Sequence, residues 1–266
     1  GTRMSEAASV VRLDPLAATT RLLVALDFDG TLSPLQDEPM AARMLPEAQH
    51  ALDALEALPD TWVALVSGRT LSDLRIIAEH RDDGRALLAG SHGAEFWIPG
   101  VGTVEPDEDA AEVALRDRLR DDIEAAVAGL PGVRIEPKTF GFALHTRLAE
   151  PLTAHSAQDI VDALVVSSAP HWRRRVGHNI VEYAFRQEGK DAAVAVLRER
   201  VGATAVLFAG DDVTDEDALR SLGADDLGVR VGETGTPTAA AVVVPDIRAM
   251  AALLARLAAE RAARRE

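Results

Sequence analysis

The chain has 266 residues, with 28 Lys and Arg against 43 Asp and Glu, so its formal net charge is −15. Such an acidic chain is a poor partner for nucleic acid, whose phosphates it would repel. It contains no cysteine, which excludes a disulfide framework, a thiolate nucleophile and a cysteine-based zinc site. No apolar run approaches the ~20 residues that cross a bilayer, and no basic segment followed by an apolar one opens the chain. We therefore expect a soluble, cytoplasmic protein without membrane contact, in which any metal is bound by oxygen or imidazole.

Short apolar runs alternate with amphipathic stretches along most of the chain, which is the pattern of a parallel sheet covered by helices. The predicted fold class is therefore α/β. The runs that predict strands span residues 21–26, 62–66, 86–89, 205–209, 227–231 and 240–244. The helical patterns between them begin near Pro46, Leu71, Lys190, Asp215 and Asp246.

The rhythm changes between residues 105 and 183, where a long charged helix, two strands, a second helix and two more strands follow one another. This change predicts an α+β insert in an α/β core. The expected division is a core domain at 1–104 and 184–266, interrupted by an inserted domain at 105–183. Pro and Gly punctuate 99–109, which we interpret as the entry linker, with a turn at 100–105.

Three of the predicted core strands end at polar clusters, at residues 27–31, 67–69 and 210–215. All strands of a parallel sheet point the same way, and ligands of such sheets bind in the crevice at the carboxyl ends. We therefore expect the three clusters to converge on one site, although they lie far apart in the sequence.

The first cluster suggests a metal and phosphate site. Asp27 and Asp29 point to the same side of an extended segment, and two such carboxylates repel each other unless a cation lies near them. Asp211 would add a third oxygen ligand, which suits Mg²⁺. Gly30 permits a tight turn, and Thr31 offers a hydroxyl and an N–H to phosphate. Taken alone, this cluster equally suits a simple turn after a strand; the three clusters together favour the metal site.

A carboxylate in such a cluster can attack phosphorus to form an aspartyl-phosphate. The transferring phosphoryl group needs positive charge, which the metal and Lys190 would supply. Lys190 is not part of a P-loop, because no glycine lies five residues before Gly189 and no Ser or Thr follows. A lysine that opens a surface helix is usually solvated, but its place between the second and third clusters favours a role in phosphate binding.

These motifs resemble a known family. DFDGTLSPL (27–35), VSGR (66–69), Lys190 and GDDVTDEDAL (210–219) are similar, in order, to the four signature motifs of haloacid dehalogenase superfamily phosphatases. Within that superfamily, the segments that resemble trehalose-6-phosphate phosphatases are SHGAEF (91–96), IEPKTFGFALHTR (135–147) and VEYAFRQEGK (181–190). The resemblance covers about residues 22–257 and implies a Rossmann-like core with an α/β cap inserted between the second and third motifs.

The resemblance also implies roles for individual residues. Asp27 would be the nucleophile and Asp29 the general acid and then base, while Ser67 and Lys190 would bind the transferring phosphate. The implied ligands of Mg²⁺ are Asp27, Asp29 and Asp211, with Asp212 and Asp215 in or just behind that shell. The implied substrate contacts are Gly30, Thr31, Gly68, Arg69, His92, Glu136, Lys138, His145, Arg147 and Glu182. Those of the cap have an alternative interpretation, since alternate residues of a strand can simply face solvent.

The implied function is Mg²⁺-dependent hydrolysis of trehalose 6-phosphate to trehalose and phosphate through an aspartyl-phosphate, by a monomer or weak oligomer. The sequence departs from the family at residues 182–185, which read EYAF rather than Glu-x-x-Pro, and at Lys190-Asp191 rather than Lys-Gly. A phosphatase of another glycosyl phosphate, such as glucosyl-3-phosphoglycerate or a pseudo-disaccharide phosphate, therefore stays open. A phosphomutase is less favoured because its cap is usually helical. A phosphorylated receiver has no use for a second acid or a cap, and a non-catalytic binding protein has no use for a nucleophilic carboxylate.

Overall fold

The structure is a computed structural model that describes residues 11–232, 235 and 237–265. The chain divides into two compact units. The core unit comprises the residues up to Glu105 and those from Glu188 onward, and the inserted unit runs from Pro106 to Gln187. Among the residues that the structure describes, no helix is both long and apolar enough to span a membrane.

The core unit contains an eight-stranded sheet with the order β12-β11-β10-β1-β2-β3-β4-β5. The strands from β12 to β3 pair in parallel, and β4 and β5 extend the sheet in antiparallel fashion. The predicted α/β class is therefore confirmed. The strands are β1 (Leu22–Leu26), β2 (Thr61–Val66), β3 (Leu87–Gly90), β4 (Glu95–Ile98), β5 (Gly102–Val104), β10 (Ala205–Gly210), β11 (Leu227–Val231) and β12 (Val242–Val244).

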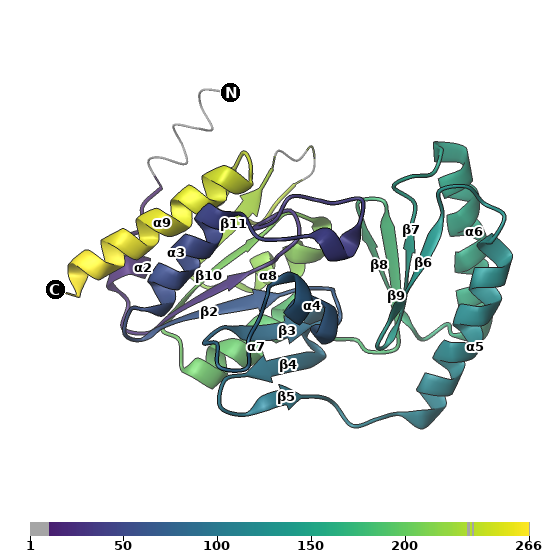
Figure 1. Ribbon diagram of the computed structural model, residues 1–266, viewed down its shortest axis with the longest axis horizontal. Coiled ribbons are helices and arrows are strands. Elements are labelled where there is room, and N and C mark those ends of the chain that lie inside the picture. Colours follow the sequence, from purple (N-terminus) through teal and green to yellow (C-terminus); the bar gives the residue numbers. More distant parts are fainter. Residues whose placement is uncertain (1–10, 233–234, 236, 266) are drawn as a thin grey trace. The chain divides into compact units, whose positions relative to one another are not determined.

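Helices cover both faces of this sheet, and the alternation of side chains along β1 shows the two cores. Leu22, Val24 and Leu26 belong to one buried cluster, whereas Leu23 and Ala25 belong to the other. The helices on the first face are α2 (Asp14–Ala18), α3 (Pro46–Glu56), α4 (Leu71–Ile77) and α9 (Ile247–Arg264), of which α3 and α9 lie side by side in Figure 1. Those on the second face are α7 (Lys190–Val201) and α8 (Glu216–Ser221).

The helix starts follow from local chemistry. Pro46 occupies the first turn of α3, where its missing N–H costs nothing. Thr70 caps α4 by accepting a hydrogen bond from the N–H of Asp73, and Asp246 caps α9 by accepting one from the N–H of Ala249. Local signals of this kind are why the predicted helix starts lie within one residue of the observed ones.

The prediction of a turn at residues 100–105 was wrong in part. A turn forms at 99–101, but Gly102–Val104 then forms strand β5, which pairs with β4. The sequence pattern predicted neither β4 nor β5. Gly100 and Gly102 adopt φ of 79° and 94°, as the tight reversal requires. The two strands are only partly buried, so their structure depends on the pairing between them. Their sequences therefore lack the alternation of apolar residues that would predict strands.

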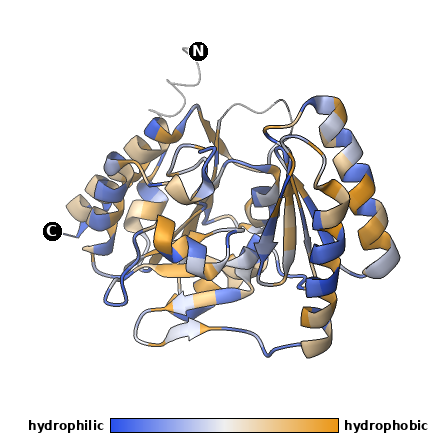
Figure 2. Ribbon diagram, turned by 45° about the vertical axis from the view of Figure 1, so that its right-hand side comes forward, coloured by the Kyte–Doolittle hydropathy of each residue, from blue (hydrophilic) through white to orange (hydrophobic). Residues whose placement is uncertain are grey.

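The inserted unit contains a four-stranded antiparallel sheet with the order β6-β7-β9-β8. One face of this sheet carries Phe142, Leu144, Val181 and Tyr183, which pack with apolar residues of two long helices. Figure 2 shows both helices striped by apolar and hydrophilic residues, as their half-buried position requires. The elements are α5 (Ala110–Val127), β6 (Arg134–Lys138), β7 (Gly141–His145), α6 (Pro151–Ser168), β8 (Arg173–Gly177) and β9 (Ile180–Ala184).

Among the described residues of the core unit there are also three short 3₁₀ helices, each of which contains or contacts a predicted site residue. They are η1 (Pro39–Ala41), η2 (Ser91–Gly93) and η3 (Val213–Asp215).

Candidate active site

The polar clusters continue the central strands of the core sheet directly. The N–H of Asp27, just after β1, donates to the carbonyl of Ala209 on β10 at 2.9 Å. The N–H of Ser67, just after β2, donates to the carbonyl of Ala89 on β3, also at 2.9 Å. The backbone ladder therefore fixes the first residue of each cluster at the same edge of the sheet.

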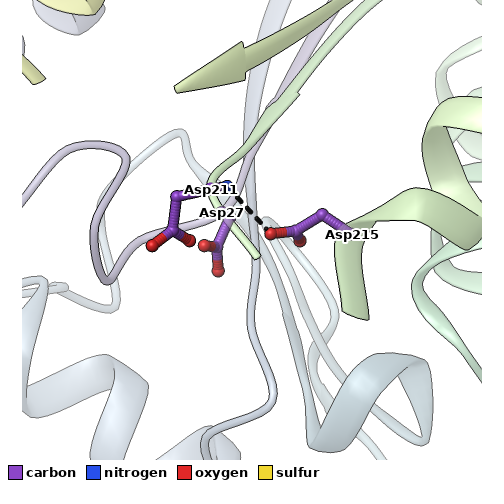
Figure 3. A group of neighbouring side chains, drawn as sticks. All are labelled: Asp27, Asp211 and Asp215. Carbon is purple, nitrogen blue, oxygen red and sulfur yellow. Dashed lines mark hydrogen bonds between the residues drawn. The ribbon is translucent and has the colours of Figure 1, made fainter. Parts of the chain in front are cut away.

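Three carboxylates gather at this edge. Oxygen atoms of Asp27, Asp211 and Asp215 all lie within 4.8 Å of one another, and we call these residues the acidic group. In Figure 3 the carboxylates of Asp27 and Asp211 lie side by side, and Asp215 approaches from η3. Burial and the charge of Asp215 raise the pKa of Asp27 to about 6, and burial and the charge of Asp27 raise the pKa of Asp211 well above its usual value. An oxygen-only donor set in which like charges crowd together fits a hard divalent cation.

Lys190 is the counter-charge within the acidic group. Its Nζ lies 3.0 Å from Oδ1 of Asp27 and 2.6 Å from Oδ1 of Asp215. Burial alone would lower the pKa of this amine, but Asp215 and Asp27 outweigh burial and raise it. The side chain is buried rather than solvated, so Lys190 holds a fixed positive charge beside Asp27.

Asp215 organises the acidic group from behind. Its Oδ2 accepts hydrogen bonds from the N–H groups of Asp211 and Asp212, both at 3.0 Å, while its Oδ1 accepts from Lys190. Both oxygens of this fully buried carboxylate are thus already engaged by donors. Asp212 is not brought into the acidic group; its Oδ1 accepts from the N–H of Val213 at 2.7 Å and starts η3.

Two glycines allow the carboxylates to approach. A Cβ at Gly30, which has φ of +76°, would lie 1.8 Å from Oδ2 of Asp211. A Cβ at Gly210 would lie 2.2 Å from Cγ of Asp215. Thr31 borders the same space, with its hydroxyl 3.4 Å from Oδ2 of Asp27.

Asp29 is held elsewhere. Its two carboxylate oxygens accept hydrogen bonds from Nε and Nη2 of Arg69 at 2.8 and 2.7 Å, in a bidentate ion pair. The structure therefore brings Asp29 together with Arg69 and does not include its carboxylate in the acidic group.

The second cluster is supported by a strained turn. The hydroxyl of Ser67 accepts from the N–H of Arg69 at 3.0 Å, and Gly68 lies between the two residues. Ser91 and His92 adopt φ of 49° and 59°, and their N–H groups donate to the carbonyls of Arg69 and Ser67 at 2.7 and 3.0 Å. Such a backbone persists only where its surroundings hold it, and here it supports the loop of Ser67.

Glu95 is a buried residue of this region that sequence reasoning missed. Its Oε2 accepts from the N–H of Leu71 at 3.1 Å and from the hydroxyl of Ser91 at 2.6 Å, which ties the strained turn to the start of α4. Glu95 opens β4, a strand that the pattern did not predict. Glu95 lies within SHGAEF (91–96), which resembled the family, but without the strand its contacts could not be assigned. The close approach at Gly210 had no signal in the sequence.

The predicted sugar contacts of the inserted unit form a second charged group, which we call the sheet cluster: Glu136, Lys138, His145 and Glu182. His145 Nε2 and Glu136 Oε1 form a hydrogen bond of 2.6 Å, and Lys138 Nζ lies 3.8 Å from Glu136 and 3.5 Å from Glu182. Burial would raise the pKa of Glu136, but His145 and Lys138 outweigh it and lower the pKa to about 2. Arg147 follows β7 by two residues.

Comparisons with known proteins agree with these motifs. The family model described as trehalose-phosphatase matches residues 25–240. A probable trehalose-phosphate phosphatase of Sinorhizobium fredii is 32% identical over 237 residues, which cover 88% of this chain and 86% of that protein. The trehalose-phosphate phosphatase of Mycolicibacterium paratuberculosis is 35% identical over 75% of this chain, but the chain spans only 51% of that longer relative.

Solved structures share the fold. The C-terminal domain of a C. albicans trehalose-6-phosphate phosphatase gives a TM-score of 0.81 with 21% identity, covering 93% of this chain and 95% of that one. A subclass IIB sugar phosphatase of the haloacid dehalogenase superfamily gives 0.57 with 15% identity, covering 86% and 95%. The predicted haloacid dehalogenase fold is thus confirmed. Because the family model matches residues 25–240 and the Sinorhizobium relative is 32% identical over most of both chains, this chain belongs to the trehalose-phosphatase family.

Proposed function

We propose that this protein is a Mg²⁺-dependent phosphoric monoester hydrolase that converts trehalose 6-phosphate to trehalose and phosphate. Membership of the trehalose-phosphatase family supports the reaction. The observation that carries the mechanism is the position of Lys190 on Oδ1 of Asp27, beside the carboxylate of Asp211.

Asp27 is the proposed nucleophile. Its oxygen attacks phosphorus, the bond between phosphorus and the sugar oxygen breaks, and Asp29 gives a proton to the departing oxygen. Water then attacks the aspartyl-phosphate and loses a proton to Asp29, which restores Asp27 and releases phosphate. Lys190 offsets the negative charge of the incoming phosphate, which the acidic group would otherwise repel.

Asp27 and Asp211 are the proposed side-chain ligands of Mg²⁺, because both oxygens of Asp215 already accept hydrogen bonds. Asp29 would contribute its main-chain oxygen, since Arg69 engages its carboxylate. Asp212 and Asp215 lie behind these ligands. The cation would supply positive charge to the phosphoryl oxygens as charge redistributes in the transition state.

We assign the remaining phosphate contacts to Gly30, Thr31, Ser67 and Gly68, which flank Asp27 on the loops that follow β1 and β2. His92 contributes through the backbone of the turn that supports Ser67. Arg69, which was predicted to bind substrate, pairs with the carboxylate of Asp29.

Sugar recognition is assigned to the sheet cluster and to Arg147. Sugar hydroxyls each need a donor and an acceptor, and Glu136, Lys138, His145 and Glu182 offer both within one connected group. In the sequence, Phe185 and Asp191 depart from the family pattern, so another glycosyl phosphate is the competing substrate.

The test is phosphate release by the purified protein from a panel of trehalose 6-phosphate, glucose 6-phosphate and glucosyl-3-phosphoglycerate, with the Asp27→Asn variant as the blank. We expect the highest kcat/KM for trehalose 6-phosphate, because a site built to pair hydroxyls rejects a ligand that lacks them. Faster turnover of glucosyl-3-phosphoglycerate would change the assigned substrate but would leave the assignment as a phosphatase intact.

A further inference from the structure

The pair between Asp29 and Arg69 does not suit every step of the proposed mechanism equally. A general acid must carry a proton, yet both oxygens of Asp29 accept hydrogen bonds from the guanidinium of Arg69. A general base must be an oriented carboxylate with a lone pair left for water. A carboxylate has about four acceptor positions, so a bidentate pair that uses two leaves two for water.

The position of Arg69 is fixed independently of Asp29. Its Nη2 also donates to the carbonyl of Pro39 at 2.9 Å, and its Nη1 lies 3.9 Å from the sulfur of Met40, both in η1. Only 12% of the Arg69 side chain is exposed, against 27% of Asp29. Arg69 is therefore the anchored member of the pair, and Asp29 is the member more exposed to solvent.

The donors of Arg69 are not arranged to grip a phosphate. An arginine can bind an anion in bidentate fashion through Nε and Nη2 or through Nη1 and Nη2. Here the first edge, or fork, holds Asp29, and at the second edge Nη2 donates to the carbonyl of Pro39 while Nη1 lies against the sulfur of Met40. Binding a phosphate through the first fork would require Arg69 to release Asp29. This geometry argues against the direct substrate contact that the sequence predicted for Arg69.

We infer that Arg69 is a positioning residue for the second half of the reaction: it holds Asp29 as an oriented carboxylate that activates water against the aspartyl-phosphate. This inference rests on the proposed function. In the first half the pair must loosen so that Asp29 can take a proton from solvent and give it to the sugar oxygen. In the second half Asp29 removes a proton from the attacking water in the position seen here, and then returns it to solvent.

The test is pre-steady-state hydrolysis of p-nitrophenyl phosphate with Mg²⁺, because p-nitrophenolate leaves without an acid and its release reports the first half alone. For Arg69→Met we expect steady-state kcat to fall about 10- to 100-fold through lost orientation. We expect the first turnover to stay fast, so that a burst approaching one p-nitrophenolate per enzyme appears, with KM not raised. Arg75→Met is the matched control. Arg75 lies six residues further on, in α4, and stacks on Trp97, so its loss should not alter the wild-type burst behaviour or kcat.

A double-mutant cycle with Asp29→Ala separates action through Asp29 from direct action. If Arg69 acts through Asp29, then adding Arg69→Met to Asp29→Ala costs less than about 3-fold more in kcat, because coupled residues are not additive. The inference would be overturned by any of three results: kcat losses that multiply in the double mutant, a raised KM for the aryl phosphate in Arg69→Met, or a fall in its kcat without a burst.

Folding and the wider mechanism are checked separately. If Arg69→Met lowers the melting temperature sharply, Arg69→Lys keeps the charge but loses the fork, and the same burst is expected from it. Asp27→Asn separates a failure of the proposed function from a failure of the role inferred for Arg69. Full turnover by that variant would remove the proposed function, whereas an inactive Asp27→Asn together with an Arg69 variant without a burst would remove only the role of Arg69.

Discussion

The acidic group of the core unit and the sheet cluster of the inserted unit are both built from carboxylates and amines on neighbouring strands, yet their charges are balanced differently. In the sheet cluster, Glu136 is paired with His145 and Lys138, and its pKa falls to about 2. The acidic group holds three carboxylates and one amine, which pairs with Asp27 and Asp215, and burial and the charge of Asp215 raise the pKa of Asp27 to about 6. In the sheet cluster the partners of Glu136 favour its carboxylate form, whereas in the acidic group burial and crowding disfavour the carboxylate forms of Asp27 and Asp211, as expected of a site that takes a cation.

The two regions also differ in how their geometry is fixed. The acidic group depends on the backbone, through the ladder bonds of Asp27, the N–H groups that hold Asp215, and the glycines that let carboxylates approach. The sheet cluster depends on strand register, since Glu136, Ala143 and Glu182 form one row across β6, β7 and β9. The proposed chemistry is assigned to the region that the backbone fixes, and the proposed sugar recognition to the region that strand register fixes.

The largest effect is expected from removing the cation that balances the charge of the acidic group. Removal of divalent cations with EDTA should abolish phosphate release, because Asp27 and Asp211 would then repel the substrate phosphate, and Mg²⁺ should restore it. Calcium should restore little, since its longer bonds and looser coordination would misplace phosphorus relative to Asp27. Phosphate release in metal-free buffer at the rate seen with Mg²⁺ would contradict the assignment of this site.

A smaller effect should follow from filling the close approach at Gly30. Gly30→Ala places a methyl group on Oδ2 of Asp211, so we expect kcat to fall by about 10²-fold through misplacement of the carboxylate. Gly100→Ala is a matched control, because Gly100 has a similar φ of +79° with nothing within 4 Å of the added carbon. It should cost about 1 kcal/mol of stability and no activity. Equal activity losses in the two variants would show that backbone strain, not the clash, is responsible.

Substitutions in the sheet cluster should separate recognition from chemistry. Lys138→Ala and Glu136→Gln should lower kcat/KM for trehalose 6-phosphate by about 10-fold, the value of one or two polar contacts, while sparing p-nitrophenyl phosphate. Arg174→Ala is the control, because Arg174 pairs with Asp162 and not with the sheet cluster. It should leave kcat/KM for both substrates unchanged. A matching loss on both substrates would place the sheet cluster in folding rather than in recognition.

The smallest expected effect concerns stability and its dependence on pH. Burial and Asp53 raise the pKa of Glu56 on α3 to about 7, from 4.5. A raised folded pKa means that stability is fully present below pH 4.5 and falls as pH rises through 7. Glu56→Gln should therefore stabilise the protein at pH 8 by about 1 kcal/mol after allowance for solvent screening, and should leave it unchanged at pH 4.

Glu136 should behave in the opposite way. Its folded pKa of about 2 lies below 4.5, so its stabilisation is present above pH 4.5 and is lost only as pH falls through 2. Glu136→Gln should destabilise the protein equally at pH 5 and pH 8 in denaturant titrations. A stability gain at pH 8 from this variant would show that His145 and Lys138 do not stabilise the carboxylate of Glu136.

Several features of the site followed from the sequence because they depend on chain direction. Asp27, Ser67 and Asp211 end neighbouring parallel strands, so their meeting is a consequence of topology. The bidentate hold of Arg69 on Asp29 did not follow, because η1 and the loop after β2 meet only in the tertiary structure. Glu95 was missed for a related reason, since its strand is set by pairing at the sheet edge and not by apolar periodicity.

The central claim is that Asp27 carries the phosphoryl group between the two displacements. The most direct measurement is acid quench of the enzyme during turnover of trehalose 6-phosphate with Mg²⁺, followed by mass spectrometry of the peptide that contains residues 27–35. We predict one added phosphoryl group on that peptide at Asp27, more of it in Arg69→Met, and none in Asp27→Asn or without Mg²⁺. A phosphoryl group on another residue, or continued turnover by Asp27→Asn, would contradict the account.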